Sequence, residues 1–121
     1  MPEMSLTSTP APAIDLSAMQ RHACDASALL KAMGNEQRLL ILCQLVEGDL
    51  SVGELGARIK LSQSALSQHL AVLREAGMVQ TRRSAQTIFY SLANGPVRQV
   101  MQTLHAIYCA PEQESQATRH D

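Results

Sequence analysis

The sequence contains few aromatic residues: it has no tryptophan, one phenylalanine and two tyrosines. Its interior must therefore be built from Leu, Ile, Val, Ala and Met, a composition that favours helices. The hydrophobic fraction of 45% excludes general disorder. A chain of 121 residues fits one domain, and oligomerisation often stabilises a core of that size. Length and composition thus predict a small helical domain that forms a dimer.

The sequence also lacks an apolar run long enough to span a bilayer. Its first residues, M-P-E-M-S-L-T-S-T-P-A-P, lack the basic and apolar regions of a signal peptide. We therefore expect a cytoplasmic protein with no membrane partner. The cysteines Cys24, Cys43 and Cys109 are an odd number at wide spacing, which argues against a structural disulfide framework and favours reduced thiols.

No overall excess of basic charge is present, since the formal net charge is −1. The charge is unevenly distributed along the chain, however. Residues 56–90 contain a single acid, Glu75, and five basic residues: Arg58, Lys60, Arg74, Arg82 and Arg83. Such a local excess of positive charge is compatible with a DNA-binding surface.

The stretch from Ser51 to Arg83 carries the clearest structural pattern. Its second half, S-Q-S-A-L-S-Q-H-L-A-V-L-R-E-A-G, begins at Ser62, which can cap a helix, and ends at Gly77, which can terminate one in a left-handed conformation. Leucines recur between them at helical spacing. The preceding S-V-G-E-L-G-A-R-I-K predicts a shorter helix opened by a capping box of Ser51 and Glu54. Two helices joined so closely predict a helix-turn-helix.

The second of these helices carries short polar and amide side chains on the face opposite its leucines. We expect this face to enter a major groove, where Gln can form two hydrogen bonds with adenine. A surface helix rich in amides is the alternative. His69 faces the less polar side and is expected to pack within the domain rather than read a base. The predicted DNA-binding residues are Gln63, Ser64, Ser67, Gln68 and Arg74, together with Arg82 and Arg83 in a following hairpin.

The remaining segments complete a winged helix-turn-helix. A first helix is predicted from an Asp15 cap to Met33, a largely buried second helix over residues 36–47, and a last helix that starts at Asn94 and Pro96. Strands over 78–81 and 87–92, separated by a turn at 82–86, form the hairpin, or wing. The fold class is mainly α with a small β-hairpin, in the order α-α-α-α-β-β-α. Residues 14–109 form this domain, and 1–13 and 110–121 are expected to be flexible tails.

Apolar stripes on the first and last helices predict further contacts. Each stripe follows the spacing of a helix that packs against another helix. The stripes consist of Leu16, Met19, Ala23, Ala26, Leu30 and Met33 on the first helix, and of Val97, Val100, Met101, Leu104 and Tyr108 on the last.

Arg38 lies in the first turn of the second helix. It is expected either to support the core or to approach the DNA backbone.

The run from Leu30 to Tyr90, with L-L-K-A-M-G-N-E-Q-R-L-L-I-L, L-S-Q-S-A-L-S-Q-H-L-A-V-L-R-E-A-G-M-V and T-I-F-Y-S-L, resembles the ArsR/SmtB family of winged-helix bacterial repressors. The resemblance implies a homodimer, formed through the first and last helices, that binds pseudo-palindromic double-stranded operator DNA. It also implies a regulator rather than an enzyme. A small thiol enzyme is further disfavoured because the chain has no Cys-x-x-Cys motif and no βαβ pattern.

Members of this family often bind metals, but the residues of two frequent metal sites are missing. Where one site has a Cys-x-Cys pair, this chain has S-V-G, and the last helix offers only His105 of the ligand pairs used by the other. A cluster of Cys43, Cys109, His105 and His22 lacks a recognised ligand spacing. We therefore predict no metal site and no cofactor.

The segments R-L-L-I-L-C-Q-L-V-E-G and L-H-A-I-Y-C resemble the sulfide-responsive and biofilm-growth-associated repressors of this family. The resemblance implies that Cys43 and Cys109 form a redox switch. Low-molecular-weight persulfides or polysulfides would join them in a disulfide or sulfur-extended bridge and release the DNA.

The alternatives on the same scaffold are a response to peroxide or other thiol oxidants and a response to a metal ion. Cys24 has no counterpart in the pair and is interpreted as a core or surface thiol. His105, one turn before Cys109, is interpreted as an exposed helix residue; the alternative is that, when protonated, it lowers the pKa of Cys109.

Overall fold

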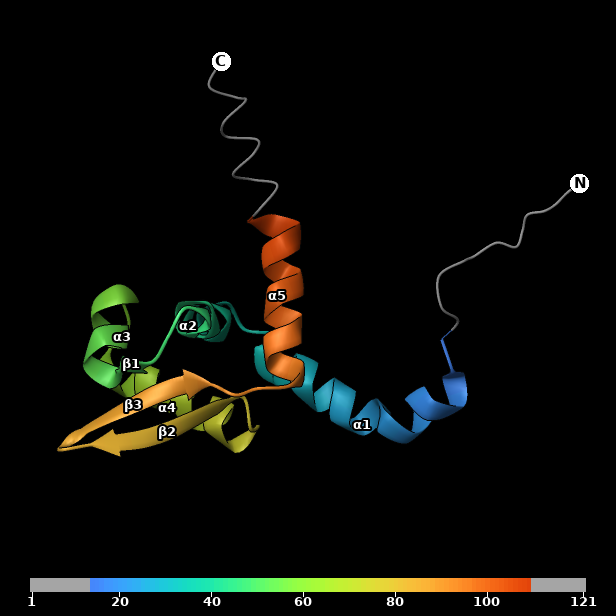
Figure 1. Ribbon diagram of the computed structural model, residues 1–121, viewed down its shortest axis with the longest axis horizontal. Coiled ribbons are helices and arrows are strands. Elements are labelled where there is room, and N and C mark those ends of the chain that lie inside the picture. The colour runs from blue at the N-terminus through green and yellow to red at the C-terminus, as the bar shows by residue number, and fades with distance from the viewer. Residues whose placement is uncertain (1–13, 110–121) are drawn as a thin grey trace, which may run out of the picture.

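The structure, a computed structural model, describes residues 14–109. The predicted tails at 1–13 and 110–121 lie outside the described residues. Residues 14–109 form five helices and three short strands (Figure 1). In chain order these are α1 (Leu16–Met33), α2 (Glu36–Val46), β1 (Leu50–Ser51), α3 (Val52–Arg58), α4 (Gln63–Glu75), β2 (Val79–Ser84), β3 (Thr87–Leu92) and α5 (Pro96–Tyr108). The mainly helical winged fold is as predicted.

Capping side chains fix the helix starts where the sequence predicts them. The Asp15 carboxylate accepts a hydrogen bond from the backbone N–H of Ala18 at 3.2 Å, ahead of α1. Ser51 and Glu54 form the reciprocal capping box of α3, with distances of 3.1 and 2.9 Å. The Ser62 hydroxyl accepts from the N–H of the third residue of α4 at 3.1 Å. Each such cap stabilises a helix by about 1 kcal/mol.

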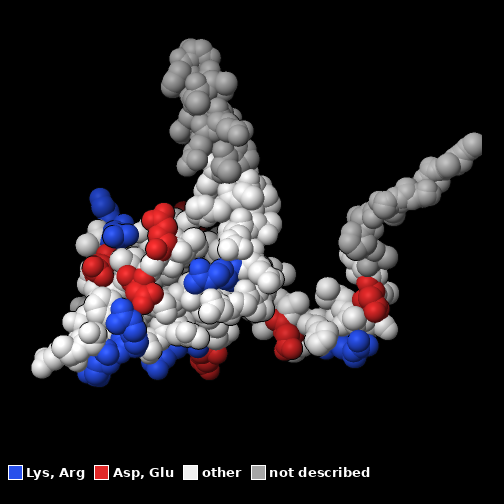
Figure 2. All heavy atoms as spheres, viewed as in Figure 1, with Lys and Arg blue, Asp and Glu red and all other residues white. Residues whose placement is uncertain are grey.

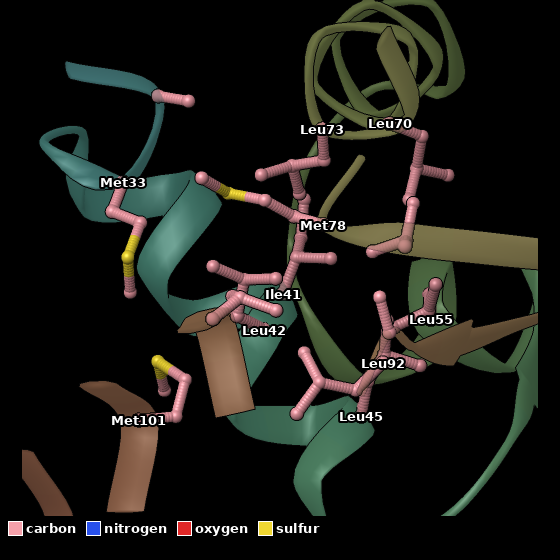
Figure 3. Close-up of a cluster of buried hydrophobic side chains, with 14 of the residues drawn as sticks. Met33, Ile41, Leu42, Leu45, Leu55, Leu70, Leu73, Met78, Leu92 and Met101 are labelled. Atoms are coloured by element: carbon pink, nitrogen blue, oxygen red, sulfur yellow. The ribbon is translucent and has the colours of Figure 1, made fainter. Parts of the chain in front are cut away.

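One hydrophobic core joins α2, α3, α4, the strands and the base of α5. Figure 3 shows methionines and leucines from these elements meeting around α2, with Met33 from the end of α1 and Met101 from α5 at one side. Eight side chains are almost completely buried: Ile41, Leu42, Leu45, Leu55, Leu66, Leu70, Leu73 and Met78. Because the core is aliphatic and closely packed, replacing one of these leucines with alanine would cost roughly 2–5 kcal/mol.

The sheet differs from the prediction in two respects. It has three strands in the order β1-β3-β2, because residues 50–51 pair with Tyr90 and Phe89 in β3. A strand of two residues is too short to produce a sequence period, so the pattern could not reveal it. The wing strands also continue past the expected turn, and the Ser84–Thr87 pair closes the hairpin over only two residues. The first of these, Ala85, has φ of +58°, the positive φ that tight hairpin turns require.

Two helix predictions also need correction. α2 is buried mainly on one face, and Leu40 is 43% exposed. In a domain of this size the core covers only one face of α2, so apolar residues on its other flank remain accessible. α5 is preceded by Gly95 in the cap position, with φ of +109°, rather than by Asn94. Pro96 does occupy the first helical position, as predicted.

α1 extends away from the body of the domain. α5 follows β3 and lies on the same side of α2 as α1 does (Figure 1). Much of the predicted stripe on α1 is exposed: Leu16 is 65% and Leu30 61% accessible. Only the C-terminal end of α1 is held firmly, because Arg38 Nε donates to the Ala32 carbonyl at 2.6 Å and its Nη2 to the Lys31 carbonyl at 3.4 Å. Of the two roles considered for Arg38, the structure therefore shows support of the fold.

Candidate DNA-binding surface and dithiol site

α4 presents its polar face to solvent as the helical period requires. Leu66, Leu70 and Leu73 point into the core and anchor the helix. The helix ends at Glu75, and Gly77, which follows the Ala76 cap, has a φ of +74° that allows the N–H of Met78 to bond the Leu73 carbonyl at 2.9 Å. All five predicted DNA-binding residues of this helix are exposed: Gln63, Ser64, Ser67, Gln68 and Arg74. His69 is half-buried, in agreement with a packing role.

The two wing arginines lie within β2 rather than in a turn, because the β2–β3 pairing includes both of them. Both are exposed, but Arg82 is engaged within the protein. Its Nε donates to the Asp49 carboxylate at 3.1 Å, and its guanidinium lies 4.6 Å from the centre of the Phe89 ring. Figure 2 shows basic side chains along the edge of the molecule that carries the hairpin. Arg83 is therefore the wing residue whose charge is more readily available to a phosphate.

A second candidate site lies between α2 and α5. Cys43 from the middle of α2 and Cys109 from the C-terminal end of α5 line one shallow cavity of about 190 Å³. The other lining residues are mostly apolar: Leu39, Leu40, Met101, Leu104, His105 and Tyr108. Both cysteines are half-buried free thiols. The fold thus places at one cavity the two cysteines that the family resemblance had paired.

His105 belongs to this site, which corrects its interpretation as an exposed residue. It is half-buried, and its Nε2 lies 3.5 Å from Cys43 Sγ, within hydrogen-bonding distance for sulfur. The two residues are 62 positions apart, so only the packing of α5 on α2 produces this contact. From the sequence, His105 was related to Cys109 through their spacing on one helix, and to Cys43 only as a member of a possible metal cluster.

Burial raises the pKa of the Cys43 thiol above its ordinary value, and the nearby charges of Cys109 and Glu47 raise it further. Desolvation disfavours the charged thiolate, and negative neighbours act in the same direction. Cys43 is therefore held as a neutral thiol at pH 7.

The other sulfur and imidazole groups lie elsewhere. Cys24 is exposed on α1, which settles its position as a surface thiol. His22 lines a different hollow, together with α1 residues and Pro96. Within residues 14–109, no three His, Cys, Asp or Glu side chains come together in an arrangement that could hold a metal ion. The four-residue Cys/His cluster considered from the sequence is therefore not assembled in this part of the chain.

Two features of these sites were missed by sequence reasoning. No sequence pattern indicated a role for Asp49, because its partner Arg82 lies 33 positions away. The direct contact between Cys43 and His105 was likewise not predicted, although both residues had been considered as members of one possible metal cluster. No local pattern signals either contact, because each depends on two elements that meet only in the folded chain. The structure also describes no helix with the length and apolar character needed to cross a membrane.

Comparison with known proteins identifies the family of the chain and supports its fold. Residues 35–81 match the profile described as "Bacterial regulatory protein, arsR family". The chain is 52% identical over 100 residues to the transcriptional activator HlyU of Vibrio cholerae, covering 83% of this chain and 93% of that protein. It is 47% identical over 100 residues to the biofilm growth-associated repressor of Agrobacterium fabrum, covering 83% and 86%.

Solved structures agree with these relationships. Reduced HlyU from Vibrio cholerae superposes with a TM-score of 0.73 at 54% identity, covering 77% of this chain and 98% of that one. The repressor BigR from Xylella fastidiosa gives a TM-score of 0.73 at 42% identity, covering 80% and 99%. These relatives are transcriptional regulators, in agreement with the prediction that the chain is not an enzyme. The chain belongs to the ArsR family of winged helix-turn-helix, DNA-binding transcriptional regulators.

Proposed function

We propose that this protein is a cytoplasmic transcriptional repressor that senses reactive sulfur species through Cys43 and Cys109 and releases its operator when these thiols are bridged. The observation that carries the proposal is the cavity between α2 and α5, which both thiols line. Two cysteines brought from distant parts of a chain to one accessible hollow can react with the same small molecule in succession. The cavity volume, about 190 Å³, suits a small inducer rather than a large ligand.

The chemistry begins with a low-molecular-weight persulfide, R–S–SH. The first cysteine attacks the outer sulfur, the S–S bond of the persulfide breaks, and R–SH leaves while the cysteine becomes a persulfide. The second cysteine then attacks the inner sulfur of that group and expels H₂S, which leaves a disulfide. If both cysteines are first converted to persulfides, the same expulsion of H₂S leaves a bridge of three sulfur atoms.

DNA binding in this proposal uses the exposed face of α4 and the wing of two copies of the chain. Gln63, Ser64, Ser67 and Gln68 would lie near base edges, while Arg74, Arg82 and Arg83 would contact the backbone. The exposed stripe on α1, with Leu16, Met19 and Leu30, supports a homodimer because it is too apolar to remain in water. A two-fold dimer would present two α4 helices to the half-sites of a pseudo-palindromic operator.

A bridge between Cys43 and Cys109 would join α2, which supports α4, to α5, which is one of the two helices of the proposed dimer interface. α2 packs against α4 on one side and against α5 on the other, so joining Cys43 to Cys109 fixes the angle between α2 and α5. That constraint would move the two α4 helices away from the spacing of successive major grooves. A coupling of about 1–3 kcal/mol is typical of such effects and would weaken DNA binding roughly 5- to 150-fold.

The test combines mass spectrometry with promoter binding. The anaerobically reduced protein is treated separately with glutathione persulfide, glutathione disulfide and hydrogen peroxide, and each sample is assayed on the promoter DNA of its own gene region. A Cys43–Cys109 crosslink that forms selectively with the persulfide and accompanies the loss of binding is the expected result. A crosslink formed equally with peroxide would favour a general oxidant sensor. Release of DNA by a metal ion without any crosslink would overturn the proposal.

A further inference from the structure

The contact between Cys43 and His105 has a chemical role that the dithiol bridge alone does not assign. Cys43 Sγ and His105 Nε2 are 3.5 Å apart and belong to helices that meet only through tertiary packing. We propose that His105 is the proton acceptor that activates Cys43, so that Cys43 is the first of the two thiols to react with the inducer. This inference rests on the switch proposed above and specifies which residue starts it.

The surroundings of Cys43 leave a role for a proton acceptor. The titratable side chains around it are Glu47 on its own helix and His105, Tyr108 and Cys109 on α5. The remaining lining is apolar, and among residues 14–109 no Lys or Arg lines the cavity to stabilise a thiolate directly. Burial, together with Coulombic interactions with Cys109 and Glu47, raises the pKa of Cys43, so little free thiolate forms at neutral pH. A base that removes the proton during the attack therefore speeds the reaction of a thiol in such a site.

The geometry also distinguishes the two cysteines. The described structure records an imidazole in contact with Cys43, and His105 lies on the same helix as Cys109, four positions before it. The N–H of Cys109 donates to the carbonyl of His105 at 2.9 Å, so the backbone holds the two residues in a fixed relation. Cys43 is therefore placed to attack with help from His105, and Cys109 is placed to resolve the product.

The first step is balanced by one proton that His105 takes up and returns. As Cys43 Sγ attacks the outer sulfur of R–S–SH, its proton passes to neutral Nε2 of His105. The S–S bond of the persulfide breaks, and the departing R–S⁻ recovers the proton from the imidazolium as R–SH. Cys43 is left as a persulfide, and His105 is again neutral. Cys109 then attacks Cys43 Sγ and expels H₂S, which carries away the Cys109 proton.

The experiment measures the reactivity of Cys43 without any inducer or DNA. The reduced full-length protein is alkylated with iodoacetamide across a range of pH, and the rate at each cysteine is followed by peptide mass spectrometry. His105→Gln keeps a hydrogen-bonding group of similar reach but cannot act as a base. We expect Cys43 to be alkylated about 10-fold more slowly or worse at pH 7 in this variant. The difference should close at high pH, once the thiol ionises without help.

Matched variants separate this role from a structural one. His22→Gln changes an exposed histidine outside the cavity and should leave the Cys43 rate unchanged. In His105→Ala, which opens space beside Cys43, imidazole added to the solution should restore part of the rate. Failure of that rescue together with an unchanged pH profile in His105→Gln would overturn the role of His105.

The outcomes also distinguish this inference from the proposed function. If His105→Gln alkylates normally at Cys43 while wild-type protein still forms the persulfide-dependent bridge, the inference fails and the switch stands. If His105→Gln slows Cys43 but wild-type protein forms no bridge with persulfide, the base role stands and the proposed function fails. Slower alkylation at Cys109 instead of Cys43 would overturn the assigned order of attack.

Discussion

The α4 surface and the thiol cavity are built in opposite ways. On α4, polar residues one or two turns apart share an exposed face, and the buried leucines of the same helix fix their direction. In the cavity, the reacting groups come from two helices, are half-buried, and meet across apolar side chains. A surface of the first kind follows from one helical period, whereas a site of the second kind exists only after the helices pack. The two regions should therefore be separable by mutation.

The largest expected effect comes from removing the amides of α4. In Gln63→Ala combined with Gln68→Ala, two side chains suited to bidentate contact with bases are lost, and each such contact is worth roughly 1–3 kcal/mol. Operator affinity should fall about 30-fold or more, while persulfide still crosslinks the cysteines. Fluorescence anisotropy with operator DNA measures the change. Gln102→Ala, on the exposed side of α5, is the matched control and should bind normally. Equal losses in both variants would mean that α4 does not read the DNA.

The reverse separation uses the cysteines. Cys43→Ser or Cys109→Ser should leave the operator affinity of the reduced protein unchanged but abolish the response to persulfide, which in wild-type protein is expected at roughly 5- to 150-fold. The reason is that a bridge needs both sulfur atoms. Anisotropy titrations before and after treatment measure the response, and Cys24→Ser, at an exposed position, should respond as wild type. A persisting response in either variant would refute the dithiol pair.

A smaller effect distinguishes the two wing arginines. Arg83→Ala should remove one phosphate contact and reduce the slope of log affinity against log salt by about 1. Arg82→Ala should change the slope less, because Asp49 already partly neutralises that guanidinium at 3.1 Å. Binding measured at several salt concentrations compares them. An identical change in both slopes would show that DNA displaces the Asp49 contact.

The smallest effect is on stability, through the pKa of Cys43. Burial raises this pKa in the folded protein above the ordinary value of about 9, so the folded state holds the thiol proton more tightly than the unfolded state. The resulting stabilisation is fully present below pH 9 and is lost as the pH rises through the folded pKa. Chemical denaturation of the reduced protein between pH 8 and about 11 should show a steeper decline for wild type than for Cys43→Ser. Parallel declines would contradict a buried thiol.

The contrast between the two regions also explains how far the sequence could predict the structure. The caps at Asp15, Ser51 and Ser62 and the exposed face of α4 were predicted correctly because each depends on residues within a few positions of one another. The pair Cys43 and Cys109 was found only through resemblance to a family, since nothing local links them.

The errors have the same origin. β1 and the extension of the wing strands depend on pairing with β3, which lies nearly 40 residues from β1. The position of Arg82 beside Asp49 and Phe89 follows from that pairing. The contact of His105 with Cys43 follows from the packing of α5 on α2. The β1 pairing and the contacts of Arg82 with Asp49 and of His105 with Cys43 are therefore tertiary contacts, which cannot be predicted from one segment at a time.

The exposed stripe of α1 affects how the regulator responds to its own abundance. Leu16, Met19 and Leu30 remain largely accessible in the single chain. In the proposed dimer a second copy covers them, so complete operator-binding units form by association. While single chains predominate, the number of these units rises with the square of the chain concentration, and halving the supply removes about three quarters of them. Occupancy of the operator then depends on protein dosage more steeply than it would for a regulator that binds as one chain.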